Sequence, residues 1–180
     1  MNVANVLTLI RIALVPVFVL FFYLRIPYQH IYALAVFIIA SVTDWLDGAI
    51  ARRQNLVTDF GKFMDPIADK LLVLAGIIML MSISKISPVI AIILIGRELI
   101  MSGFRLVAAA KGNVMAAGVL GKVKTVFQFL AICVLLIEDF LPEYLHYVGD
   151  ILLYISAVFA VWSCIDYIAK NKDVLSFKEM

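Results

Sequence analysis

The sequence has 180 residues, of which 64% are hydrophobic and 16% are charged, and its formal net charge is +2. Soluble domains average nearer half apolar and a quarter charged residues, so a soluble fold of this size could not bury so much apolar surface. The positive charges are grouped by segment and form no continuous basic stripe, which argues against nucleic acid as a partner. The composition therefore predicts a polytopic membrane protein that lies in the lipid bilayer.

Six apolar segments follow one another along the chain, each of about the 20 residues that a helix needs to cross a bilayer. They cover residues 5–24, 31–51, 64–84, 86–109, 115–137 and 149–169. We predict an all-α fold of six transmembrane helices that forms a single domain over residues 1–180. The first segment follows no basic region and precedes no small-residue cleavage site, so we expect a retained helix and not a signal peptide.

Lysine and arginine residues are distributed unevenly between the two sets of connections. One set, with the tail and the start of the fifth segment, holds Arg52, Arg53, Lys62, Lys111, Lys122, Lys124, Lys170, Lys172 and Lys178. The opposite set holds only Arg25 and Lys85. The positive-inside rule therefore predicts a multi-pass protein of the cell membrane with both termini at the cytoplasmic face.

The first segment begins with three polar residues, Asn5, Thr8 and Arg11, that fall on nearly one stripe of a helix. Such a stripe is typical of an interfacial anchor, in which the Arg11 side chain snorkels to water.

Acidic residues gather between the second and third segments, at Asp44, Asp47, Asp59, Asp65 and Asp69. We expect Asp59 in the connection, while the other four fall at helical spacing, at about 100° per residue. Two helices facing each other across a short connection would gather these four carboxylates around one point. Because four anions beside lipid need cations, hard divalent ions with oxygen ligands are the natural candidates.

Small residues and an arginine are interleaved with these acids at fixed spacing. The order is Asp47-Gly48-x2-Ala51-Arg52-x8-Gly61-x3-Asp65-x3-Asp69, with Asp44 three residues ahead. This pattern resembles, with no departure, the motif of the CDP-alcohol phosphatidyltransferases. Residues 96–100, Arg105 and 121–125 resemble segments of family members whose acceptor is sn-glycerol 3-phosphate, so the likeness covers nearly the whole chain.

The resemblance implies transfer of a phosphatidyl group from CDP-diacylglycerol to sn-glycerol 3-phosphate with release of CMP, at the cytoplasmic face and in a homodimer. It implies two Mg²⁺ or Mn²⁺ ions. The implied metal ligands are Asp44, Asp47, Asp65 and Asp69, of which Asp69 is also the base for the acceptor hydroxyl. The implied contacts to the CDP-lipid are Gly48, Ala51, Arg52, Gly61, Asn5 and Thr8. The start of the first helix therefore has two interpretations, as an interfacial anchor or as part of the nucleotide site.

The fourth segment carries charges where a membrane helix rarely has them. Arg97 and Glu98 lie near its middle, and we expect separate partners for them because neighbours on a helix do not face each other. They are either functional or a structural ion pair within the bundle. Arg105, with Lys122 and Lys124 beyond the next connection, is predicted to bind the acceptor phosphate, although each could instead snorkel.

Other interpretations stay open. The acid motif reports only the donor chemistry, so the acceptor could be inositol phosphate, serine or another phosphatidylglycerol. Six spans with intramembrane charges also suit an ion transporter, although the acids cluster at one face instead of tracing a path across the bilayer. Cys133 and Cys164 lie in apolar runs and are interpreted as small core residues.

Overall fold

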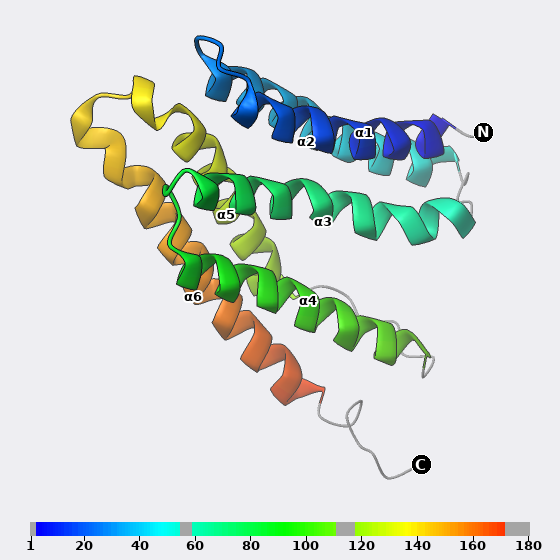
Figure 1. Ribbon diagram of the computed structural model, residues 1–180. Helices are drawn as coiled ribbons and strands as arrows, with labels where there is room; N and C mark the ends of the chain where they lie inside the picture. Colours follow the sequence, from blue (N-terminus) through cyan, green and yellow to red (C-terminus); the bar gives the residue numbers. More distant parts are fainter. Residues whose placement is uncertain (1–2, 55–58, 111–117, 172–180) are drawn as a thin grey trace. The chain divides into compact units, whose positions relative to one another are not determined.

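The computed structural model describes residues 3–54, 59–110 and 118–171, and the side chains within them except those of residues 3–5, 44–54, 59–66, 69 and 109–110. This described part is helical and contains no strand (Figure 1). Its helices are α1 Val3–Tyr23, α2 Gln29–Gln54, α3 Asp59–Ser82, α4 Pro88–Ala110, α5 Val119–Ile137, η1 Glu138–Phe140, η2 Glu143–Leu145 and α6 His146–Lys170. The prediction of an all-α chain with six long helices is therefore confirmed for these residues, whereas the prediction that all six cross a membrane stays a prediction.

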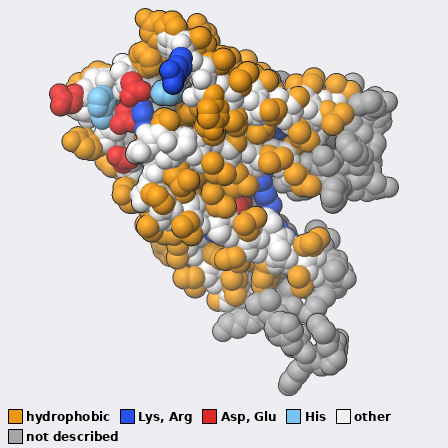
Figure 2. All heavy atoms as spheres, viewed as in Figure 1, with side chains coloured by type: hydrophobic (Ala, Val, Ile, Leu, Met, Phe, Trp, Pro, Cys, Tyr) orange, Lys and Arg blue, Asp and Glu red, His pale blue; other side chains and the backbone are white. Residues whose placement is uncertain are grey.

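Length and composition suit a membrane. Three described helical stretches are long and apolar enough to cross a bilayer, at Val6–Tyr23, Val119–Phe140 and Glu143–Lys170. Gln29–Thr43 and Lys70–Ser82 are shorter apolar helices. Hydrophobic side chains dominate the face shown in Figure 2, where charged side chains are few. Water would disfavour so much exposed apolar surface, so the helices fit a membrane protein.

The ends of α2 and α3 differ from the predicted apolar segments. Helix α3 begins at Asp59, so the expectation that Asp59 lies in the connection was wrong. Helix α2 likewise continues to Gln54, beyond the apolar run. Backbone hydrogen bonds extend a helix whether or not its side chains are apolar, and an acid is favourable at a helix N-terminus.

The described helices belong to two compact units. The first unit contains α1, α2, α3 and η1, and its α1 contacts both α2 and α3. Phe18 of α1 is fully buried, with ring centroids 5.8 Å from Phe37 of α2 and 5.3 Å from Phe22. Ala33 and Ala40 of α2 are also fully buried, and small residues let membrane helices approach closely. Since α1 contacts both α2 and α3, it links the two helices that carry the acid motif.

The second unit contains α4, most of α5, η2 and α6. Met101, Phe104 and Ala108 of α4 form a buried cluster with Tyr167 of α6, in which the Phe104 and Tyr167 rings meet edge to face at 5.6 Å. Helix α5 is tied to α6 by Ser156, whose hydroxyl donates to the carbonyl of Lys124 at 3.3 Å. These contacts connect three helices that carry charged residues within largely apolar sequences.

Candidate active site

The acid motif lies on two helices of the first unit. Asp44 and Asp47 fall in α2, and Asp65 and Asp69 fall in α3, which confirms that both halves of the motif are helical. Helix α2 contacts α3 in this unit. The side chains of Asn5, Asp44, Asp47, Gly48, Ala51, Arg52, Gly61, Asp65 and Asp69 lie outside the described residues. Their assignments to metal, CDP-lipid and base therefore remain predictions.

Thr8 and Arg11 of α1 are both buried, each with 1% of its surface exposed. A snorkelling arginine would place its guanidinium in water, so the interfacial-anchor interpretation of Arg11 was wrong. A charged side chain is retained inside a membrane protein where it faces polar partners or a functional cavity. The burial therefore favours the alternative, in which this end of α1 belongs to a polar site.

A cluster of charged side chains joins the helices of the second unit. Nη1 of Arg97 donates to Oε1 of Glu98 at 2.9 Å, and Nζ of Lys124 on α5 pairs with the same oxygen. Each residue has a separate partner as expected, Ser163 for Arg97 and Lys124 for Glu98, but the two also pair with each other, which we did not expect. Adjacent helical positions diverge by about 100°, but two long side chains can turn toward one point and close that angle.

A pocket of about 220 Å³ adjoins this cluster. Its lining comes from three helices and one connection: Arg97, Arg105, Gly118, Val119, Leu120, Gly121, Ser163, Asp166, Tyr167 and Lys170. Nζ of Lys170 lies 2.8 Å from Oδ2 of Asp166, so these two charges offset each other. Among the described lining residues, the other charges are those of Arg97 and Arg105. Glu98, which lies outside the lining, offsets Arg97, so Arg105 makes this lining cationic.

Some described residues of the lining carry buried side-chain donors that have no hydrogen-bond partner. Among the described residues, Nε of Arg105 and the hydroxyl of Tyr167 are buried and have no hydrogen-bond partner. The pocket wall includes the start of α5 at Val119, and the first turn of a helix presents backbone N–H groups that lack acceptors within the helix. Unsatisfied donors, a helix N-terminus and two guanidinium groups together suit an anion with several oxygen atoms, such as a phosphate.

The structure separates the three cations that the sequence grouped as an acceptor site. Arg105 lines the pocket, whereas Lys122 is exposed on α5 and Lys124 is buried in its ion pair with Glu98. Neither lysine belongs to the lining of the pocket. The second cation beside Arg105 is Arg97, which our sequence analysis left without a role.

The α6 side of the pocket was missed in the sequence analysis. Its members stand at spacings of three and four residues and share one helical face: Ser163, Asp166, Tyr167 and Lys170. A polar stripe of this kind in an otherwise apolar segment is the signal that could have found them.

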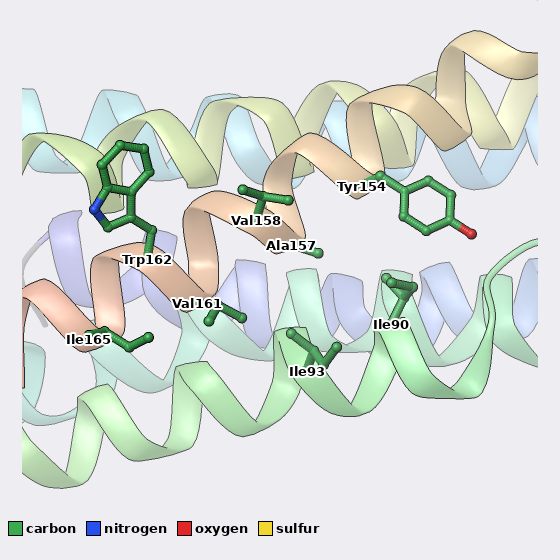
Figure 3. Close-up of a pocket in the computed structure, with 8 residues that line it drawn as sticks. All are labelled: Ile90, Ile93, Tyr154, Ala157, Val158, Val161, Trp162 and Ile165. Atoms are coloured by element: carbon green, nitrogen blue, oxygen red, sulfur yellow. The ribbon is translucent and has the colours of Figure 1, made fainter.

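Helices α4 and α6 also border an apolar groove of about 540 Å³ (Figure 3). Ile90 and Ile93 extend from α4 toward α6, which contributes Tyr154, Ala157, Val158, Val161, Trp162 and Ile165. Apart from the Tyr154 hydroxyl and the Trp162 ring N–H, no lining side chain can donate a hydrogen bond. The groove thus suits hydrocarbon and not a phosphate.

Comparisons with known proteins agree with the motif. The profile of the CDP-alcohol phosphatidyltransferase family matches residues 1–162. The chain is 41% identical to the CDP-diacylglycerol–glycerol-3-phosphate 3-phosphatidyltransferase of Bacillus subtilis (strain 168) over 97% of each chain. Its identity to the protein of the same name from Rickettsia bellii is 40%, over 89% of this chain and 90% of the relative. Its identity to the protein of the same name from Escherichia coli (strain K12) is 37%, over 97% of each chain.

Proposed function

Because this chain belongs to the CDP-alcohol phosphatidyltransferase family, we propose that it transfers the phosphatidyl group of CDP-diacylglycerol to sn-glycerol 3-phosphate. The products are phosphatidylglycerophosphate and CMP. The observation that carries the proposal is the unbroken motif from Asp47 to Asp69 in a chain that matches relatives named for this reaction along nearly its full length. The cationic pocket supports an acceptor that bears a phosphate.

The motif acids fit a divalent metal centre. Asp44, Asp47, Asp65 and Asp69 would supply only hard oxygen donors, from two helices that contact each other. Two Mg²⁺ or Mn²⁺ ions bound there would neutralise charge on the donor's pyrophosphate as its bond to CMP breaks. Gly48, Ala51 and Gly61 leave room for the nucleotide, and Arg52 pairs with the pyrophosphate. Asn5 and Thr8 of α1 contribute to the same CDP-lipid site.

Asp69 serves as the general base. It takes the proton of the acceptor hydroxyl, whose oxygen then bonds to the phosphorus of the phosphatidyl group while the oxygen bridging to CMP leaves. A carboxylate is a weak base in water, but a partly dry site beside other acids makes it a stronger one.

The acceptor's phosphate binds in the cationic pocket. Arg105 and Arg97 supply charge, and the Tyr167 hydroxyl and the first turn of α5 supply further donors. This assignment keeps Arg105 from the sequence prediction and replaces Lys122 and Lys124 by Arg97. A site with unsatisfied buried donors rejects an acceptor that lacks the matching group, which separates sn-glycerol 3-phosphate from glycerol.

The enzyme spans the cell membrane six times as a homodimer, with both termini and the acid motif at the cytoplasmic face. The distribution of lysine and arginine supports this orientation, and the apolar length of three described helices supports three of the spans. The water-soluble acceptor and the water-soluble product CMP would then exchange with the cytoplasm.

An acceptor panel tests the function. The purified protein is incubated with CDP-diacylglycerol and Mg²⁺, and CMP release is measured with sn-glycerol 3-phosphate, glycerol, inositol phosphate, serine or phosphatidylglycerol. We expect release with sn-glycerol 3-phosphate and little with the others. Equal or faster release with another acceptor would overturn the acceptor assignment, and the absence of release with every acceptor would overturn the reaction.

A further inference from the structure

Glu98 joins two cations and, through them, three helices. Its Oε1 atom accepts a hydrogen bond from Nη1 of Arg97 at 2.9 Å and pairs with Nζ of Lys124. Arg97 uses its other terminal nitrogen, Nη2, to donate to Oγ of Ser163 at 3.2 Å. The guanidinium that lines the cationic pocket is thus held at one edge by α4 and at the other by α6.

The charged members of this cluster are largely removed from solvent. The exposed fractions of their side chains are 16% for Glu98, 8% for Arg97 and 1% for Lys124. One carboxylate oxygen meets two cations, Arg97 and Lys124. Truncating one partner of a buried ion pair is strongly destabilising because the other charge stays buried. Glu98 therefore controls both the position and the balance of charge at this site.

The orientation of Arg97 matters because of its place against α5. A Cβ atom added to Gly121 would lie 3.1 Å from Nη2 of Arg97, so the guanidinium lies against the first turn of α5. Glycine permits this close approach. Arg97 and the residues of that first turn line the same pocket. A phosphate bound there would meet the guanidinium charge and the positive end of the helix dipole together.

We propose that Glu98 is a positioning residue of the cationic pocket, which orients the Arg97 guanidinium toward the phosphate of the acceptor and offsets the charge of Lys124. The inference rests on the proposed function for the identity of the bound anion. Donors that are already oriented bind an anion more tightly because less conformational entropy is lost on binding. A defect at Glu98 therefore weakens acceptor binding more than donor binding.

The test compares Glu98→Gln and Glu98→Asp in the full-length enzyme, with Glu143→Gln in η2 as a matched control outside the pocket. We expect Glu98→Gln to raise the KM for sn-glycerol 3-phosphate by about tenfold and to change the KM for CDP-diacylglycerol by less than about twofold. Glu98→Asp keeps the carboxylate and recovers part of the loss. Glu143→Gln leaves both constants unchanged.

Two further variants keep the test informative if Glu98→Gln folds poorly. Ser163→Ala loosens the other edge of the guanidinium without changing any charge, and we expect a rise of about threefold in the acceptor KM. Glu98→Gln combined with Lys124→Met removes the buried cation along with its partner. This double variant should regain thermal stability and retain the raised acceptor KM, because Arg97 still lacks its anchor.

Inorganic phosphate separates this inference from the proposed function. Its binding is measured as a rise in the unfolding temperature of the purified protein, which needs no catalysis. Stabilisation of the wild type but not of Glu98→Gln supports positioning, even if sn-glycerol 3-phosphate proves not to be the acceptor. Positioning is overturned if the double variant has a normal acceptor KM, or if Glu98→Gln weakens both substrates equally and binds phosphate like the wild type.

Discussion

The acid motif of α2 and α3 and the cationic pocket of α4, α5 and α6 carry opposite charges and are built in opposite ways. The motif occupies one continuous stretch from Asp44 to Asp69, in which the acids of each helix stand three or four residues apart, at the repeat of one helical face. The pocket depends on partners as distant as Arg97 and Ser163, which form a hydrogen bond across 66 positions of the sequence. We infer that the chemistry common to the family is encoded locally, whereas recognition of the acceptor is assembled by tertiary packing.

The cationic pocket and the apolar groove show the same contrast within one pair of helices. Both are lined by α4 and α6, and the neighbours Ile165 and Asp166 belong to different sites. One step along a helix turns a side chain by about 100°, which is enough to exchange a hydrocarbon surface for a polar one. The helical phase of α6 therefore decides which of its residues line the apolar groove and which line the cationic pocket.

The largest expected effect comes from removing the metal that the acid motif is proposed to bind. A chelator in excess should abolish CMP release, because the donor's pyrophosphate would lose its charge neutralisation, and added Mg²⁺ or Mn²⁺ should restore it. CMP release in detergent is the measurement. Full activity in excess chelator would contradict the proposed metal centre and leave the motif acids without a role.

The second largest effect on activity is expected for Asp69, the proposed general base. Asp69→Asn should lower kcat by about a thousandfold while the KM for CDP-diacylglycerol changes little, because a base acts mainly in the transition state. Asp59→Asn is the matched control, since Asp59 begins α3 but occupies no fixed position of the motif. Near-normal turnover of Asp69→Asn would assign the base to another group.

A smaller effect is expected at the cationic pocket. Arg105→Ala should raise the KM for sn-glycerol 3-phosphate by about tenfold and leave that for CDP-diacylglycerol nearly unchanged, because one charge-assisted contact to phosphate is lost. Arg25→Ala, an exposed arginine in the connection between α1 and α2, serves as control. Initial rates at varied acceptor and donor concentrations give both constants. Equal changes in the two would indicate that Arg105 supports the fold of the second unit and not the acceptor.

The smallest effect on catalysis is expected where packing alone is disturbed. A Cβ on Gly149 of α6 would lie 2.7 Å from Cδ2 of Leu135, so Gly149→Ala should destabilise the protein by about 1–3 kcal/mol through overpacking. Gly103→Ala, where a Cβ meets nothing within 4 Å, should be neutral or slightly stabilising. Thermal unfolding measures the difference. A changed acceptor KM in Gly149→Ala would show that the pocket depends on this contact.

The sequence by itself determined the helical class, the order of the helices and the helicity of both halves of the acid motif. These features are local, because a run of apolar residues of membrane length and a fixed spacing of acids need no information about distant partners. The apolar runs did not determine where the helices begin and end. The start of α3 at Asp59 lies ahead of the apolar run, since backbone hydrogen bonds continue a helix through polar residues.

Only the tertiary structure decided which charges meet. The burial of Lys124 against Glu98, the hydrogen bond of Arg97 to Ser163, and the presence of Arg105 and Tyr167 in one pocket all depend on how α4, α5 and α6 pack. The sequence specifies the phase of each helix but not the neighbour that each face meets. Long side chains can also rotate, so an arginine, a glutamate and a lysine can converge from positions whose Cα–Cβ bonds point in different directions.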